Sequence, residues 1–264
     1  MTFAASYQPR RGARPALSWG VAIVIAIASW QAICSAGLVS PIILASPSSI
    51  VHAAAVDGGE FLAAFRVTVV EIAIAVAATW SLGIAVGVLA GADALAALSI
   101  NPILSSFFAI PLTVWYPLFV VWFGLGSESK IIYGVVCGFF PVALNTLAGI
   151  RLLDPHYIAF GRAIGAGRLQ IQLRILLPLA LPPIVAGLRI GTALVVSSVI
   201  LAEMLASVDG LGFWISYHRT LFNTGHVYLG ILLALACVLL VNVGLSHLER
   251  RLGRWREGGE DRHA

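Results

Sequence analysis

Long apolar segments dominate this sequence and limit the folds that are open to it. An α-helix rises about 1.5 Å per residue, so about 20 apolar residues cross the hydrocarbon core of a bilayer. Six segments reach that length, near residues 18–36, 67–90, 100–123, 131–150, 184–205 and 227–245. The sequence therefore predicts an all-α membrane protein with six transmembrane helices.

The composition excludes an ordinary water-soluble domain. Hydrophobic residues make up 59% of the 264 positions and charged residues only 11%, whereas soluble domains carry about 25% charged residues. The net charge of +4 would suit a nucleic acid, but no arginine-rich patch is interleaved with aromatic residues. We therefore expect a lipid bilayer around the chain and no nucleic-acid partner.

The basic residues indicate an orientation, because cytoplasmic loops carry an excess of Lys and Arg. With both termini in the cytoplasm, twelve of the sixteen basic residues lie in inner segments. Arg66, Lys130 and Arg219 lie at outer edges or loops, and Arg189 lies inside the fifth segment. The sequence thus predicts a multi-pass protein of the cell (inner) membrane with both termini inside.

The same orientation divides the chain into three parts. A cytoplasmic tail (1–17) precedes a transmembrane domain (18–250), and a second cytoplasmic tail (251–264) follows it. After Trp255, the glycine and charged residues of 258–261 predict disorder in the second tail.

The first outer loop contains a helix signal. Ser46 and Pro47 have the pattern of an N-cap followed by proline at the first helical position. We expect a short interfacial helix from there to about Val56, ended by Gly58 and Gly59.

The inner segment 151–183 contains a spaced motif made of Ala159, Phe160, Gly161, Arg162, Ala163, Gly165, Ala166, Arg168, Ile175, Leu177 and Pro178. The motif resembles the EAA loop of binding-protein-dependent ABC permeases, in which a glycine and then Ile-x-Leu-Pro follow an acidic-Ala-Ala start. The glycine and the Ile-x-Leu-Pro sequence match at the correct spacing. The acidic residue of the start is replaced by Ala159.

Segments 118–126, 139–146 and 202–212 extend the resemblance toward the nitrate, sulfonate and taurine branch of that family. The resemblance implies the transmembrane domain of a type I ABC importer, a permease subunit that forms the path for a small, anionic solute. A sulfonate, taurine, nitrate or bicarbonate is such a solute. It also implies three partners: ABC ATPase subunits, an extracytoplasmic solute-binding protein and a second permease copy in a homodimer.

Other classes explain the sequence less well. A secondary transporter or channel without an ATPase is the alternative, but such proteins need no docking loop and usually show internal repeats or charged relays. A purely structural assembly factor leaves the prolines of the third segment and the intramembrane acids unexplained.

Signatures of catalysis and of cofactor binding are missing. The sequence has no GxxxxGK[ST] phosphate loop, no GxSxG elbow and no HExxH metal motif. Its three cysteines, Cys34, Cys137 and Cys237, lie in apolar segments without a CxxC pair. We expect no enzyme activity, no metal and no cofactor in this chain, and ATP hydrolysis in a separate subunit.

The motif predicts a coupling element. Gly165 permits a sharp turn between two short helices, because glycine accepts positive φ. Pro178, Pro182 and Pro183 are expected to keep these helices from continuing into the fifth segment. The result is a compact docking element for an ATPase, with Arg162 and Arg168 at its rim. An ordinary basic loop that only fixes orientation is the alternative.

Two acids inside the apolar segments are candidates for the solute path, because burying a charge there costs about 2.5–3.5 kcal/mol. Glu203 is either a latch or pathway group near the outer gate, or an interfacial residue that reaches water. Glu71 follows Arg66 by five residues, which rules out an i,i+4 pair. It either tunes the path toward a less anionic solute, pairs with a neighbouring helix, or stays hydrated at the interface.

The third segment contains Pro102, Pro111 and Pro117, which predict kinks. Trp115 and Tyr116, between two of these prolines, either line the path or pack against another helix.

Small and polar residues complete the candidates. Asn145 and Thr146 offer hydrogen bonds to a solute or to another helix, and for Ser197 and Ser198 we expect bonds between helices. In the second segment, glycines 83, 87 and 91 form a GxxxGxxxG series, which predicts close helix packing within the subunit or at a dimer seam.

Overall fold

Helices form every regular element of the described chain, so the predicted all-α membrane fold is confirmed. The structure is a computed structural model that describes residues 14–260, with side-chain surroundings for 20–241, 243 and 244. The predicted tail residues 1–13 and 261–264 lie outside the described residues.

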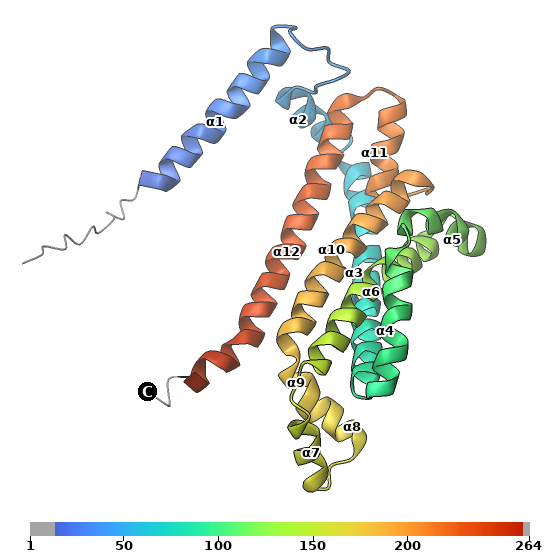
Figure 1. The fold of residues 1–264 in the computed structure, drawn as a ribbon. Coiled ribbons are helices and arrows are strands. Elements are labelled where there is room, and N and C mark those ends of the chain that lie inside the picture. The colour runs from blue at the N-terminus through green and yellow to red at the C-terminus, as the bar shows by residue number, and fades with distance from the viewer. Residues whose placement is uncertain (1–13, 261–264) are drawn as a thin grey trace, which may run out of the picture.

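The elements follow one another in this order along the chain (Figure 1): α1 (Arg14–Ser35), α2 (Pro47–Val56), α3 (Gly58–Gly91), α4 (Ala94–Ala109), η1 (Leu112–Trp115), α5 (Tyr116–Phe123), α6 (Ser127–Arg151), α7 (His156–Ala163), α8 (Arg168–Ile171), η2 (Gln172–Leu176), α9 (Leu177–Leu179), α10 (Leu181–Leu205), α11 (Leu211–Thr220) and α12 (Thr224–Glu260).

The centre of the fold is α6, which packs along α3 on one side and α10 on the other. Glycines permit this close approach. A Cβ at Gly83 of α3 would lie 2.6 Å from Val142 of α6, and one at Gly91 would lie 3.0 Å from Ile150. The GxxxGxxxG series therefore packs inside the subunit, which is one of the two places expected for it.

The α10 side of α6 is built in the same way. A Cβ at Gly191 of α10 would lie 2.8 Å from the carbonyl oxygen of Gly138 on α6. The indole of Trp80 on α3 donates a hydrogen bond of 2.9 Å to Thr192 Oγ1 on α10. The three helices thus form one closely packed unit, which we call the core.

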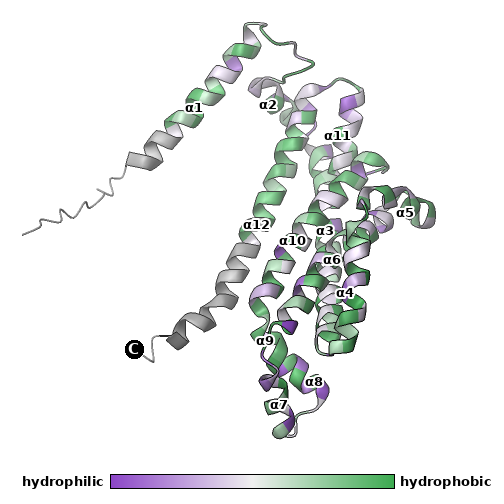
Figure 2. Ribbon diagram, viewed as in Figure 1, coloured by the Kyte–Doolittle hydropathy of each residue, from purple (hydrophilic) through white to green (hydrophobic). Residues whose placement is uncertain are grey.

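The number of unbroken spans differs from the predicted six. Among the described residues, four helices are long and apolar enough to cross a membrane: α3, α6, α10 and the part of α12 from Thr224 to Val241. A fifth span is counted if α4 and the bent segment after it are taken together, and α1 contributes a shorter apolar helix, Gly20–Ser35. Figure 2 shows the apolar colouring along these helices.

The third predicted segment is broken, contrary to the expectation of one kinked span over 100–123. The helix α4 ends at Ala109, and the chain turns by 80° into residues 112–123. The break lies at Ile110, which is extended because a residue before proline disfavours the α conformation, and Pro111 follows it. By contrast, Pro102 lies within α4 without ending it, and Pro117 occupies the first turn of α5.

Two local predictions, the short helix after Ser46 and the disorder near the C-terminus, have different outcomes. The predicted short helix is confirmed as α2, and the Ser46 hydroxyl accepts a hydrogen bond from the backbone N–H of Ser49 at 3.2 Å. The expectation that Gly58 and Gly59 end this helix is wrong, because Asp57 is its C-cap and both glycines lie in the first turn of α3. The predicted disorder after Trp255 is wrong as far as Glu260, because α12 continues to that residue.

The first helix, α1, extends away from the core (Figure 1) and contacts the rest of the described chain mainly through α2. Its apolar side chains are exposed around the helix, including Val21, Val24 and Ile27. Another hydrophobic surface, from lipid or from protein, must therefore cover it.

The glycine contacts predict a selective sensitivity to substitution. Gly87→Leu places a side chain against Thr146 of α6, and overpacking of this kind costs about 1–3 kcal/mol. We expect a clear decrease in the thermal unfolding temperature of the detergent-purified protein. The matched control is Gly20→Leu in α1, where nothing lies within 4 Å of an added Cβ. Equal effects of the two substitutions would contradict the packing role.

Candidate functional site

The segment that joins α6 to α10 forms a compact projection at one end of the core (Figure 1). We call this segment, residues 152–180, the knob. It contains α7, a turn, and a return helix made of α8, η2 and α9. All the residues predicted for ATPase coupling lie in it, so the sequence motif corresponds to one structural unit.

The turn of the knob depends on Gly165. This residue has φ +77°, a conformation that favours glycine. Its N–H donates to the carbonyl of Arg162 at 3.0 Å, and the N–H of Ala166 donates to the carbonyl of Gly161 at 3.0 Å. These two bonds form a Schellman motif, which ends α7 and redirects the chain.

A second glycine brings the two halves of the knob together. Gly161 is buried, and a Cβ there would lie 2.8 Å from Ile171 and 3.0 Å from Ile175 of the return helix. Gly161 therefore allows α7 to lie directly on that helix, and Ile175 fills the contact.

The return helix continues into α10 more directly than the prolines suggested. From Arg168 to Leu205 only Ala180 interrupts the helical elements. A π-helical turn precedes Pro178, whose ring lacks the N–H needed for regular α-helical bonding. Pro182 lies in the first turn of α10, and Pro183 packs against Gly149 of α6. The expected interruption between the knob and the fifth span is therefore present, but it is limited to Ala180, between Pro178 and Pro182.

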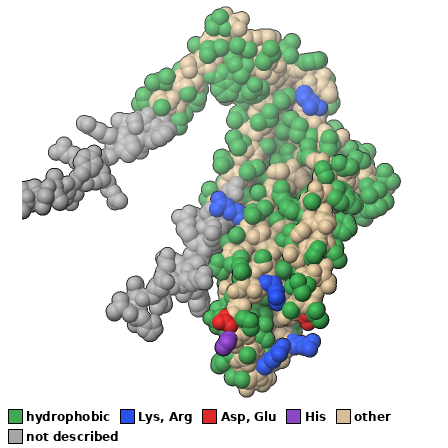
Figure 3. All heavy atoms as spheres, in the orientation of Figure 1, with side chains coloured by type: hydrophobic (Ala, Val, Ile, Leu, Met, Phe, Trp, Pro, Cys, Tyr) green, Lys and Arg blue, Asp and Glu red, His purple; other side chains and the backbone are tan. Residues whose placement is uncertain are grey.

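The surface of the knob is apolar and basic. Phe160, Ile164 and Leu169 are 62%, 64% and 63% exposed. The predicted residues Ala159, Arg162, Ala163, Arg168 and Pro178 are also exposed, and Ala166 and Leu177 are half-buried. Figure 3 shows arginine side chains gathered at this end of the molecule.

The opposite end of the core carries a cluster of buried polar groups around the loop 206–210. Glu203 at the end of α10 is 1% exposed. Its carboxylate accepts hydrogen bonds from Thr68 Oγ1 at 2.7 Å and from the N–H of Gly212 at 2.8 Å. The hydrated alternative for Glu203 is therefore wrong, and its bonds suit a latch between α10, α3 and α11.

Glu71 belongs to the same end and is also buried. Its Oε1 lies 2.7 Å from the ammonium of Lys130 on α6, which lies 2.6 Å from Asp209 Oδ1 in the loop. Hydration at the interface is thus wrong for Glu71, and pairing with a neighbouring helix is what the structure shows. Sequence reasoning missed this partner because it assigned Lys130 only to the outer edge of a span.

The aromatic candidates support the same loop. The Tyr116 hydroxyl donates to the carbonyl of Ala206 at 2.6 Å, and the side chain is buried. Trp115 is half-buried and packs beside Phe107. Together with Lys130, the Tyr116 hydroxyl connects α5 and α6 to the segment that follows α10.

The remaining pathway candidates lie elsewhere. Asn145 donates to the carbonyl of Pro141 in its own helix at 2.8 Å and lies beside Gly187 of α10. The hydroxyls of Ser197 and Ser198 donate to carbonyls of their own helix. The expected bond between helices is therefore wrong for Ser197, whereas Ser198 also lies at hydrogen-bond distance from Cys137 of α6. Pro111 is exposed at the break after α4.

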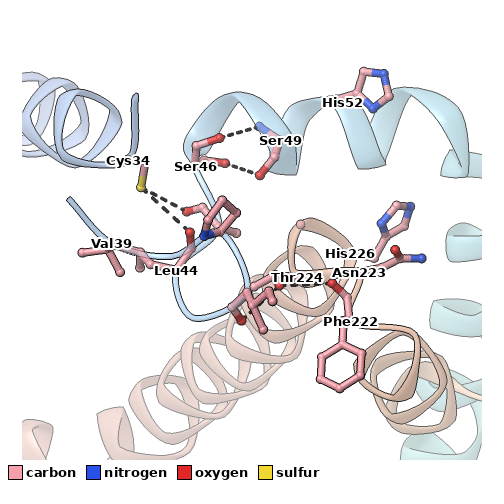
Figure 4. A pocket seen from close by; sticks show the side chains of 14 residues that line it. Cys34, Val39, Leu44, Ser46, Ser49, His52, Phe222, Asn223, Thr224 and His226 are labelled. Carbon is pink, nitrogen blue, oxygen red and sulfur yellow. Dashed lines mark hydrogen bonds between the residues drawn. The ribbon is translucent and has the colours of Figure 1, made fainter. Parts of the chain in front are cut away.

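A pocket of about 420 Å³, which the sequence did not predict, lies between the α1–α2 connection and the α11–α12 turn (Figure 4). Thr224 Oγ1 donates across it to the carbonyl of Ile42 at 3.2 Å. Nearby, burial and the neighbouring imidazole of His226 lower the pKa of His218. His226 itself lies 2.7 Å from Asp57.

The buried ion pair predicts strong coupling between two substitutions. Lys130→Met leaves the carboxylate of Glu71 without its cation, which costs about 3–5 kcal/mol in a buried site. We expect a large decrease in the thermal unfolding temperature, measured on the purified protein. The double variant Lys130→Met/Glu71→Leu removes both charges and should recover most of that loss. Additive losses in the double variant would contradict the pairing.

Comparison with known proteins agrees with this arrangement. The family model described as binding-protein-dependent transport system inner membrane component matches residues 83–254. The taurine transport system permease protein TauC of Escherichia coli (strain K12) is 30% identical, over 88% of this chain and 87% of its own length. The putative aliphatic sulfonates transport permease protein SsuC of Bacillus subtilis (strain 168) is 31% identical, over 90% and 87%.

Solved structures show the same fold. The MetNI methionine ABC transporter in an inward-facing conformation has a TM-score of 0.60 at 22% identity, over 71% of this chain and 93% of the other. The chain therefore belongs to the family of binding-protein-dependent transport system inner membrane components, and it is a multi-pass permease subunit of an ABC importer.

Proposed function

We propose that the knob is the surface on which an ATPase subunit docks. Three large apolar side chains, Phe160, Ile164 and Leu169, are exposed on a segment that also carries arginines. Exposed apolar patches rimmed by polar residues typically mark contacts with another protein. The Schellman turn at Gly165 fixes the shape of this surface, and that turn is the observation on which the proposal rests.

The core then carries movement from the knob to the other end of the molecule. The return helix runs almost directly into α10, which has 25 residues and is therefore roughly 37 Å long. Glu203 at its far end is bonded to α3 and α11. Closure of the ATPases would rotate the core as a unit and open the path alternately to each side of the membrane.

A second copy of the chain completes the path in this proposal. Importers of this type need two transmembrane subunits, and a homodimer related by a two-fold axis is the simplest arrangement. The exposed apolar surface of α1, including Val21 and Val24, supports a partner in the membrane. Both termini and the knob face the cytoplasm, which agrees with the distribution of basic residues.

A solute-binding protein would dock at the opposite face. The stretch 208–224 and the pocket of Figure 4 lie there, and Phe222 at the α11–α12 turn is 71% exposed. The solute we propose is a small anion. Relatives are named for taurine and aliphatic sulfonates, and a sulfonate is the class we assign to this importer.

The transport experiment uses the permease in proteoliposomes with its ATPase and binding protein. We expect Gly165→Asp to reduce ATP-dependent sulfonate uptake more than about tenfold, because it strains the turn by about 1–2 kcal/mol and adds a negative charge to the docking surface. Membrane insertion should be unchanged.

The matched control is Gly167→Asp, which adds the same charge two residues away. Gly167 has φ −68°, and an added Cβ would meet only Gln170 at 3.8 Å. This variant should keep most of its uptake. Normal uptake by Gly165→Asp, or uptake by the permease without an ATPase, would overturn the proposal.

A further inference from the structure

A groove runs along one side of the knob, between α7 and the end of the return helix. Its volume is about 840 Å³. Tyr157 and Phe160 of α7 line one wall, and Ile175, Pro178 and Leu179 line the other. The groove is therefore largely apolar and is long enough to receive side chains of another protein.

One cation lies in this apolar groove. Arg174 is exposed and lines the groove together with Ala159. Within the described part of the chain, no carboxylate lies at ion-pair distance from Arg174. The α7 residues that line the groove include no carboxylate, and Ala159 carries only a methyl group, so this wall supplies no counter-charge to Arg174.

The knob as a whole has the same excess of positive charge. Residues 152–180 contain three arginines and a single acidic residue, Asp154. Asp154 is already engaged, because its carboxylate accepts from the N–H of His156 at 2.9 Å and lies 3.0 Å from that imidazole. The backbone N–H of His156 also lowers the pKa of Asp154, so the acid stays ionised where it is.

We propose that this groove receives a carboxylate side chain of the ATPase subunit, which pairs with Arg174 while apolar neighbours pack against Tyr157 and Phe160. A guanidinium binds a carboxylate through two parallel hydrogen bonds, and partial exclusion of water by an apolar groove strengthens such a pair. The inference rests on the docking role proposed above. It adds that the acid at this contact comes from the ATPase and the cation from the permease.

The amino-acid composition of the chain allows a specific chemical test. Its sequence contains a single lysine, Lys130, which is fully buried at the opposite end of the core. Arg174→Lys therefore places the one accessible lysine amine of the permease in the groove. In the assembled complex, a carbodiimide should join this amine to an aspartate or glutamate of the ATPase, and mass spectrometry of the cross-linked peptide identifies the partner residue.

Two lysine variants at other places make the result interpretable. Arg168→Lys lies on the knob outside the groove, and Arg219→Lys lies on α11 at the other end of the molecule. A cross-link to the ATPase at position 174 and none at 219 supports the inference. A cross-link at 168 with none at 174 overturns it and leaves the docking role intact. If neither knob position cross-links, both the groove inference and the docking role fail.

A charge exchange gives a functional readout on the same complex. Arg174→Glu should weaken ATPase binding to the permease in nanodiscs about tenfold or more, whereas Arg174→Lys should retain it. Changing the cross-linked ATPase carboxylate to arginine in the Arg174→Glu background should restore binding. Unchanged binding by Arg174→Glu, or no recovery in the exchanged pair, would contradict the ion pair.

Discussion

Close contact between α6 and its two neighbours is the constraint on which the rest of this structure depends. Glycines at 83 and 91 of α3, and at 191 of α10, remove the side chains that would hold the helices apart. In a bilayer, lipid tails are as apolar as the side chains, so association depends on packing and hydrogen bonds rather than on exclusion of water. The core meets that requirement with backbone-to-side-chain contact over much of α6.

The buried charged residues of the core are concentrated where it meets the loop after α10. Glu203, Glu71 and Lys130 are buried, and each bonds to a segment far away in sequence. Buried charges are costly without partners, so the loop is held in one position relative to the core. At the other end of the core, the knob is joined to α10 by a helix that is interrupted only at Ala180. In the proposed mechanism, a movement imposed on the knob is passed along α10 to the loop 206–210.

Local signals in the sequence predicted the helices, the knob and the glycine packing. The spacing from Gly165 to Pro178 is local, and it corresponds to a Schellman turn followed by a return helix. Pairs between distant segments were not predictable, because nothing near Glu71 identifies Lys130 as its partner. The presence of a proline did not predict the break at Pro111 either, because Pro102 lies within α4 without ending that helix. Tertiary packing decides between such cases.

The central claim is that the core, the knob and the loop 206–210 of one subunit move together. Distances between spin labels at Ala163 in the knob and Val208 in that loop test it directly, in a background with the three cysteines replaced. To measure distances within one subunit, doubly labelled copies are diluted with unlabelled copies. The distances are recorded by pulsed electron paramagnetic resonance on the full complex, with and without ATP. The account predicts an unchanged distance within the subunit, while labels at position 163 in two copies change their separation. A change within one subunit as large as that between subunits would contradict it.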